Sequence, residues 1–255
     1  MTDQEILQIA MRQSAIDSNC RPEDFTGHQN VIVHSAGNAG ARKYLELPVS
    51  CDLVSYGTNI VASVSPEFEE TVRNYIGKYA VEHCFETPNL HVLDEAVSAY
   101  GMRVCFMAEY FLPKTDALSG QSCRYEMREL TAADFETLYL PAWSNALCEK
   151  RKELDVLGVG AYEGSRLIGL AACSADCDDM WQIGIDVLPE YRREGIASAL
   201  TQSLACRILE RGKVPFYCCA WSNIRSARNA IRSGFRPAWA QLTVRPEKFV
   251  EEMNR

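Results

Sequence analysis

The stretch from Asp179 to Gly212 changes its hydrophobic period once, and this change limits the possible fold more than any other feature of the chain. Residues 179–187, "DMWQIGIDV", alternate as a β-strand does, with one apolar face made of Trp181, Ile183, Ile185 and Val187. From Gly195 onward, apolar residues recur every four positions, as on one face of a helix: Ile196, Leu200, Leu204 and Ile208. The sequence therefore predicts a strand that turns into a helix within a few residues.

The turn between this strand and this helix has the composition of a phosphate site. The first turn of a helix leaves amide N–H groups unpaired and carries the positive end of the helix dipole, so it attracts anions. Arg192 and Arg193 add positive charge, Gly195 and Ala197 keep bulk away from the amides, and Ser198 offers a hydroxyl. The alternative is an ordinary turn with two solvated arginines, because short glycine patterns also occur by accident.

The elements around this turn follow a regular order. Strands are predicted over 124–130, 155–164, 165–175, 214–221 and 237–244, and the second and third are joined by a hairpin turn at 163–165. Thr131 and Asp134 form a capping box that predicts a helix from 131 to about 148. A short helix is expected over 224–233.

This order, with its turn, resembles the GNAT superfamily of acyl-CoA-dependent N-acyltransferases. The pyrophosphate motif of that family, Q/R-x-x-G-x-G/A, reads here Arg192-Arg193-Glu194-Gly195-Ile196-Ala197, after Val187-Leu188-Pro189-Glu190-Tyr191. A second family pattern reads Asn223-Ile224-Arg225-Ser226, followed by Gly234-Phe235. The resemblance covers residues 124–246, and two patterns in order are far more specific than either alone.

The resemblance implies a mixed α/β fold with a GNAT-like, acetyl-CoA-binding catalytic domain over 120–255. The remaining residues, 1–115, are expected to form a smaller α/β domain that shapes or covers the acceptor site. Helices are predicted there over 3–17, from Ser65 toward Cys84 and over 88–100, and strands over 30–35, 51–64 as a hairpin, and 102–112. The stretch 111–123, which follows a strand with small and polar residues, is the predicted boundary.

The resemblance also implies a cofactor site. The backbone around Ile185 and Val187 would bond the pantetheine arm, the amides from Arg193 to Ser198 would bind the pyrophosphate, and Asn223 and Ser226 would contact the far side of the arm. The predicted cofactor set is Ile185, Val187, Arg192, Arg193, Glu194, Gly195, Ile196, Ala197, Ser198, Asn223 and Ser226. The three arginines 225, 228 and 232 share a helix face and either meet the 3′-phosphate or are simply solvated.

The family's catalytic groups are only partly present. A backbone amide near Val187 would stabilise the oxyanion, as in the family. The tyrosine that often serves as the acid is replaced by Ala230, and the usual Glu or His positions hold Trp181 and Ile183.

Several residues are therefore open to more than one interpretation. Asp179 either passes protons from the site to solvent or is a turn residue at the end of the strand. Trp181 and Ile183 either line an acceptor pocket or belong to the sheet core. Tyr217 and Tyr162 are possible distant acids, with core packing as the alternative. Cys218 or Cys219 as an acyl-carrying nucleophile is a weaker hypothesis, because neither thiol has a visible activating base.

Composition narrows the ligand class. The net charge of −8 arises in residues 1–120, which hold 8 basic and 16 acidic residues, while 121–255 hold 18 of each. This surplus favours a cationic acceptor, a small-molecule or peptide amine. The nine basic residues in 192–236 suit a small anion better than a nucleic acid, although RNA binding is a third hypothesis.

The cysteines and the termini give expectations about metals and location. The 11 cysteines are scattered, and the pair Cys173 and Cys177 has no second pair or histidine nearby, so buried thiols are expected and no metal. The chain shows no signal peptide and no run of about 18 apolar residues. We expect a cytoplasmic protein, not a membrane one.

Together these features predict an N-acetyltransferase that transfers an acetyl group from acetyl-CoA to a primary amine by direct attack in a ternary complex. Because the usual acid and base positions hold residues that cannot transfer a proton, the alternative is a catalytically degenerate acyl-CoA-binding sensor or interaction module.

Overall fold

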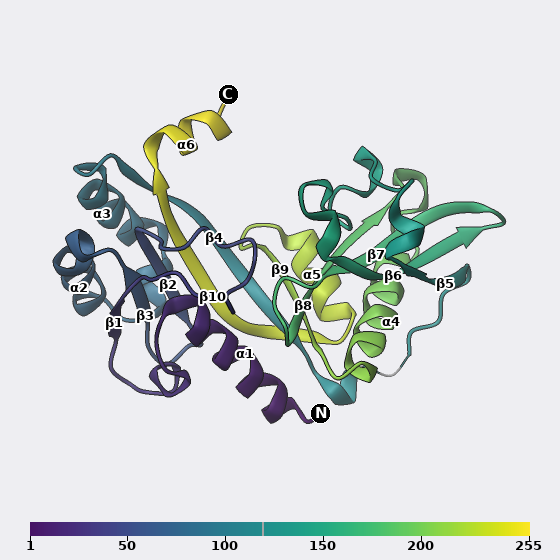
Figure 1. Ribbon diagram of the computed structural model, residues 1–255, viewed down its shortest axis with the longest axis horizontal. Coiled ribbons are helices and arrows are strands. Elements are labelled where there is room, and N and C mark those ends of the chain that lie inside the picture. The colour runs from purple at the N-terminus through teal and green to yellow at the C-terminus, as the bar shows by residue number, and fades with distance from the viewer. Residues whose placement is uncertain (119) are drawn as a thin grey trace. The chain divides into compact units, whose positions relative to one another are not determined.

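The computed structural model describes residues 1–118 and 120–255 and confirms the predicted mixed α/β fold (Figure 1). The chain divides into two compact units: unit 1 contains residues 1–10 and 111–237, and unit 2 contains residues 11–110 and 238–255. The chain passes from one unit to the other inside α1 (Asp3–Ser18), β4 (Met102–Pro113) and β10 (Phe235–Pro246). The assignment of 1–115 and 120–255 as separate domains stays a prediction, and its boundary includes Ser119, which lies outside the described residues.

Unit 1 is built on a sheet with the strand order β9-β8-β7-β6-β5. Its strands are β5 (Glu126–Thr131), β6 (Asp155–Glu163), β7 (Arg166–Ser174), β8 (Met180–Val187) and β9 (Val214–Ala220). Neighbours from β5 to β8 are antiparallel, whereas β8 and β9 are parallel and connect through α4 (Ile196–Glu210). The predicted hairpin between β6 and β7 is confirmed, and Gly164 takes its left-handed position with φ of 61°.

Helix α4 supplies the apolar stripe that the sequence predicts. Ile196, Leu200, Leu204 and Ile208 are at most 2% exposed, and they pack with Ile183 and Val187 of β8. Burial of each such side chain contributes about 1.5–3 kcal/mol. The helix can approach closely because β7 has Gly169, where a methyl group would lie 3.0 Å from Ile196 and Leu200.

The predicted helix from 131 to about 148 is wrong. The capping box forms, and Thr131 N–H donates to Asp134 at 2.8 Å, but the helical turn ends at Phe135. Pro141 starts a second short turn and restricts Leu140 to extended backbone, with φ of −125° and ψ of 155°. Two separate turns then bury Phe135 and Trp143 in one cluster and leave the segment after Trp143 beside β8.

Unit 2 is built on strands in the order β1-β3-β2-β10-β4. They include β1 (Val31–His34), β2 (Cys51–Ser55) and β3 (Val61–Val64), and the predicted hairpin between β2 and β3 is confirmed. Helices α2 (Glu69–Lys78) and α3 (Thr87–Ser98) lie together beside these strands (Figure 1). Leu53, Val64, Val72, Leu93 and Val97 form the buried core between them.

The predicted helix from Ser65 toward Cys84 is shorter than expected. Ser65 gives no side-chain cap, Pro66–Phe68 forms a single 3-10 turn, and α2 ends at Lys78. A second short turn covers Glu82–Phe85. Helix α6 (Glu247–Met253), which the sequence interpretation omitted, follows β10.

One buried region of unit 2 is polar. Asp52 of β2 lies between Ser63 of β3 and Thr243 of β10 in the strand register, so the three side chains share one face. Gln241 Nε2 donates to Asp52 Oδ2 at 2.7 Å, whereas Asp52 Oδ1 has no hydrogen-bond partner among residues 1–118 and 120–255. Burial raises the pKa of Asp52 to about 7.

Candidate active site

Strands β8 and β9 separate after three paired residues, and this separation defines the site. The parallel register joins Met180–Gln182 to Val214–Phe216, whereas β8 continues to Val187 and β9 to Ala220. Val214 N–H donates to the carbonyl of Asp179 at 2.8 Å, so odd-numbered residues of β8 direct their backbone groups toward β9. The backbone groups of Ile183 and Ile185 and the N–H of Val187 therefore face the gap and are available to an extended ligand.

The turn that follows β8 places the start of α4 at the end of this gap. Gly195, the residue before α4, has φ of 81°, and no side chain in the described part of the chain caps the helix. Its carbonyl accepts from Ala199 N–H at 3.1 Å, which leaves the amides of 196–198 without an intrahelical acceptor. A methyl group at position 195 would meet nothing within 4 Å, so an anion can approach these amides.

The two arginines of the motif have different positions. Arg192 Nε donates to the carbonyl of Val187 at 3.0 Å and ties the turn to the end of β8. Arg193 is exposed, has a left-handed backbone with φ of 69°, and forms no ion pair with any residue in 1–118 or 120–255. Positive charge is thus present beside the open amides, and the phosphate site stays a prediction.

The other motif side chains make contacts within the protein. Glu194 accepts from Tyr125 Oη at 3.0 Å and pairs with Arg124 at 2.7 Å, so its carboxylate is engaged with the segment before β5. Ser198 is 8% exposed, and its hydroxyl donates to the carbonyl of Gly195 at 3.0 Å. Ile196 belongs to the core, and Ala197 is half-buried. These residues would contribute through their backbone amides.

Helix α5 (Ile224–Arg232) begins beyond the free end of β9. Asn223 caps it, and its side-chain oxygen accepts from Ser226 N–H at 3.2 Å. Ser226 Oγ lies 2.7 Å from Tyr217 Oη of β9. The predicted contacts of Asn223 and Ser226 with a ligand arm stay predictions, since both side chains already take part in this network.

The candidate catalytic residues lie at opposite ends of β8. Val187 directs its backbone toward the gap, whereas Asp179 precedes the strand, and eight residues of strand span about 26 Å. The Asp179 side chain is 63% exposed and 4.0 Å from Lys213. Trp181 is half-buried and Ile183 is 3% exposed, and both pack against the core beneath α4.

No tyrosine occupies the usual acid position. Ala230 is fully buried there, and the nearest tyrosine in the network, Tyr217, is 3% exposed. Burial raises the pKa of Tyr217, so its hydroxyl stays protonated at neutral pH. Tyr162 lies on the distant strand β6, with Arg128 over its ring.

Sequence interpretation missed the second face of β8. Gln182 Nε2 donates to Cys218 Sγ at 3.0 Å, across the point where the two strands separate. Asp186 accepts from Asn145 N–H at 2.8 Å and Asn145 Nδ2 at 2.7 Å. A methyl group at Gly184 would overlap the carbonyl oxygen of Asn145. The alternating small and polar residues 182, 184 and 186 were the available signal.

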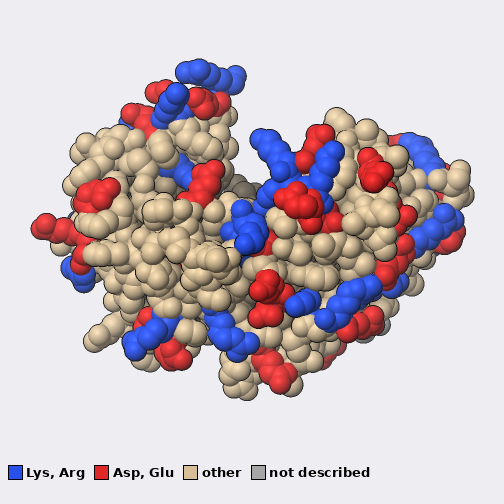
Figure 2. Space-filling model, in the orientation of Figure 1, with Lys and Arg blue, Asp and Glu red and all other residues tan. Residues whose placement is uncertain are grey.

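Charge on the surface of unit 1 is mixed. Figure 2 shows acidic and basic residues interspersed over unit 1, with a larger uncharged expanse over unit 2. The arginines 225, 228 and 232 of α5 are exposed and form no ion pair within the described part of the chain. They remain available to an anion.

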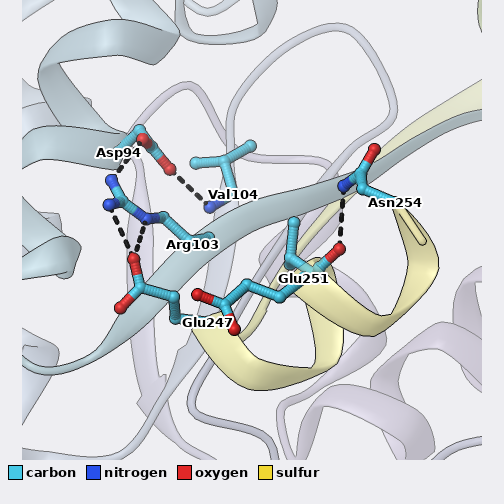
Figure 3. Close-up of a pocket in the computed structure, with 7 residues that line it drawn as sticks. Asp94, Arg103, Val104, Glu247, Glu251 and Asn254 are labelled. Atoms are coloured by element: carbon cyan, nitrogen blue, oxygen red, sulfur yellow. Dashed lines mark hydrogen bonds and ion pairs between the residues drawn. The ribbon is translucent and has the colours of Figure 1, made fainter.

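A hollow in unit 2 is lined by none of the predicted site residues (Figure 3). It encloses about 330 Å³ and is lined by Asp94, Arg103, Val104, Glu247, Val250, Glu251 and Asn254. Arg103 pairs with Asp94 at 3.0 Å and with Glu247 at 2.7 Å, so its guanidinium is already neutralised. We assign this hollow no function.

Residues 1–118 and 120–255 contain neither a metal-ion cluster nor a membrane-spanning helix. No three His, Cys, Asp or Glu side chains converge there to hold a metal ion. None of the helices in these residues combines the length and the apolar content needed to cross a bilayer.

The separated strands β8 and β9 and the uncapped start of α4 belong to a mixed α/β protein. The family model described as GNAT acetyltransferase matches residues 11–238. The chain belongs to the GNAT acetyltransferase family, whose members transfer acyl groups from CoA.

Several solved structures are similar to this chain at low sequence identity. A GCN5-related N-acetyltransferase-like protein from Streptococcus suis has 20% identity and a TM-score of 0.43, with 60% of this chain and 67% of that chain covered. A GCN5-related N-acetyltransferase from Kribbella flavida has 15% identity and a TM-score of 0.47, over 59% and 62%. A GNAT-family acetyltransferase from Colwellia psychrerythraea has 13% identity and a TM-score of 0.45, over 72% and 76%. No curated protein matches the chain.

Proposed function

We propose that this protein transfers an acetyl group from acetyl-CoA to a primary amine by direct attack in a ternary complex. The observation that carries the proposal is the gap between β8 and β9, which ends at the uncapped start of α4. An extended arm can add to β8 in the gap while its phosphates meet the helix amides. The position of this motif after the separated strand supports acetyl-CoA as co-substrate.

The residues that would hold acetyl-CoA fall into two groups. Backbone groups of Ile185 and Val187 face the gap and would bond the arm. The amides of 196–198 and the free guanidinium of Arg193 would bind the pyrophosphate. Because nothing blocks Gly195, the residues present fit this ligand.

Catalysis would need a backbone N–H that donates to the oxyanion and an acceptor amine in its neutral form. A backbone N–H of β8 that faces the gap, at Ile183 or Ile185, would donate to the developing oxyanion, because an arm whose phosphates lie at the start of α4 extends past Val187 before it reaches its thioester. The amine must lose its proton before attack, and solvent would accept it, because the exposed Asp179 lies at the far end of β8 from Val187. The amine nitrogen bonds to the acetyl carbon, the thioester C–S bond breaks and CoA leaves as its thiolate, so direct transfer needs no covalent enzyme intermediate.

The acceptor would be a small molecule or peptide with a primary amine. The acidic surplus of residues 1–120 favours an acceptor that is cationic at neutral pH. We propose a cytoplasmic setting, because the 11 cysteines are all free.

The test combines binding with turnover. Purified protein is titrated with acetyl-CoA by calorimetry, and then incubated with acetyl-CoA and a library of primary amines, with acetylated products detected by mass spectrometry. Binding with acetylation of any amine supports the proposal. Binding without turnover on any amine favours the degenerate acyl-CoA-binding module, and no binding overturns both.

A further inference from the structure

Gln182 and Cys218 connect β8 to β9 where their backbone pairing ends. The Gln182 amide donates to the Cys218 sulfur at 3.0 Å. Gln182 is opposite Phe216 in the register, so Cys218 lies two residues farther along β9. The amide side chain therefore reaches forward over the beginning of the gap.

Both side chains lie on the face of the sheet away from α4. Residues Ile183 and Tyr217 belong to the core beneath α4, so their neighbours Gln182 and Cys218 project from the opposite face. Both are half-buried rather than sealed in the core. A ligand in the gap can reach them.

The length of β8 places the reactive end of an acyl-CoA near this pair. Five residues of strand, from Gln182 to Val187, span about 16 Å. An extended arm with its phosphates at the start of α4 runs along Val187 and Ile185 toward Gln182. On the same face of β8, Gly184 is covered by the backbone of Asn145, so the acyl group has no room to spread over the strand.

We infer that the Gln182–Cys218 pair is the end wall of the acyl site and restricts the protein to short acyl groups such as acetyl. This inference rests on the proposed function. An acetyl group ends before the wall, whereas a longer acyl chain must displace the Gln182 amide and break its bond to Cys218. The pair thus sets specificity and takes no part in the chemical step.

The first test measures acyl-chain selectivity. Acetyl-CoA, butyryl-CoA and hexanoyl-CoA are compared by kcat/KM in the parent, Gln182→Ala, Cys218→Ala and the double variant. Removing the wall should lower the preference for acetyl over hexanoyl by roughly tenfold or more, the scale of a few methylenes in a pocket. Cys206→Ala, at a half-buried thiol on α4, is the matched control and should keep the parent ratio. Unchanged ratios in all wall variants would overturn the inference.

The second test needs no turnover. Alkylation of Cys218 by iodoacetamide is followed by peptide mass spectrometry, alone, with acetyl-CoA, and with 3′,5′-ADP, which lacks the arm. Acetyl-CoA should slow Cys218 alkylation at least fivefold, roughly the occupancy expected at several times Kd, while Cys206 reacts at its own unchanged rate. 3′,5′-ADP should leave Cys218 unprotected.

Failure of the inference can be told from failure of the proposed function. If acetyl-CoA raises the melting temperature but leaves Cys218 alkylation unchanged, the ligand binds elsewhere and the end wall is wrong. If acetyl-CoA neither binds nor protects, the proposed function is wrong and the inference is overturned with it.

Discussion

Arg193 and Gly195 hold the turn before α4 in a backbone conformation that most residues avoid. Their φ angles are 69° and 81°. The left-handed region costs a non-glycine residue about 1–2 kcal/mol, so Arg193 is kept there by the surrounding structure. Strain of this kind is concentrated at ligand sites, which agrees with an anion site at this turn.

Gly195→Glu should abolish acetyl-CoA binding. The carboxylate would stand over the open amides of α4 and repel the pyrophosphate. We expect Kd to rise at least about 100-fold, or roughly 3 kcal/mol. Isothermal titration calorimetry with acetyl-CoA measures the change.

Gly212→Glu is the matched control for this variant. Gly212 follows α4, also has a left-handed backbone with φ of 74°, and also has open space around it. Both variants should lose a similar 1–2 kcal/mol of stability from backbone strain. If Gly195→Glu binds acetyl-CoA as tightly as Gly212→Glu does, the phosphate site is misplaced.

Asp52 is the residue that should shape the pH dependence of unit 2 stability. Burial raises its pKa from 3.8 to about 7, so the folded chain holds this proton more tightly than the unfolded chain does. Stability from this group is fully present below pH 4 and is lost as the pH rises to about 7, by up to about 4 kcal/mol. Asp52→Asn should remove this decline.

Urea unfolding between pH 4 and pH 8 tests the Asp52 prediction. The free energy of unfolding of the parent should fall relative to Asp52→Asn across this range, and the difference should level off above pH 7. Parallel curves for the two proteins would show that Asp52 titrates normally in the folded state.

At the level of elements, the segment after Trp143 is fixed to β8 by a carboxylate and a glycine. Asp186 accepts from Asn145 N–H, Asn145 Nδ2 and Ala146 N–H at 2.7–3.0 Å. Because Gly184 has no side chain, the segment can lie directly against the strand. An irregular segment can be held this closely because its amides are satisfied by a charged acceptor.

Gly184→Ala should destabilise unit 1, because the new methyl group overlaps the backbone of Asn145. We expect a loss of about 1–3 kcal/mol, the usual cost of overpacking. Thermal unfolding by circular dichroism measures it.

Gly77→Ala is the control for the Gly184 variant, at an exposed position in α2 with nothing within 4 Å. It should be neutral or stabilise by up to about 1 kcal/mol, because alanine favours a helix more than glycine does. Equal effects of the two substitutions would contradict the close contact at Gly184.

At the level of the whole chain, the two compact units do not follow the chain order. Unit 1 includes residues 1–10, and Thr115 N–H donates to Asp3 at 2.8 Å within it. Strand β10 starts in unit 1, while its residues 240–244 pair with β2 of unit 2. A cut near residue 120 therefore removes part of unit 1 and leaves half of β10 without its partner.

The fragment 120–255 should be less stable than the same residues in the full chain. It would expose the apolar half of β10, including Leu242 and Val244, which are buried against β2. We expect aggregation or a non-cooperative thermal transition, measured by calorimetry and size-exclusion chromatography. A cooperative, monomeric fragment that binds acetyl-CoA would instead establish 120–255 as an independent domain.

Local patterns predicted most of the elements. Alternation gave β8, the four-residue repeat gave α4, and the turn residues gave the β6–β7 and β2–β3 hairpins. The helix over 131–148 failed because Pro141 interrupts it and because burial of Phe135 and Trp143 favoured two short turns. In the candidate site, the turn and the start of α4 were predictable from the motif, whereas the side chains that contact one another were not.

The amino-acid sequence by itself determined the strand-to-helix turn, its open amides and its positive charge, because hydrophobic periodicity and the backbone freedom of glycine act over a few residues. Only the tertiary structure decided where β8 and β9 separate, that Gln182 meets Cys218 there, and that Asn145 covers Gly184. These contacts join residues far apart in the chain, and their positions follow from how helices and strands pack together. No local pattern encodes that packing.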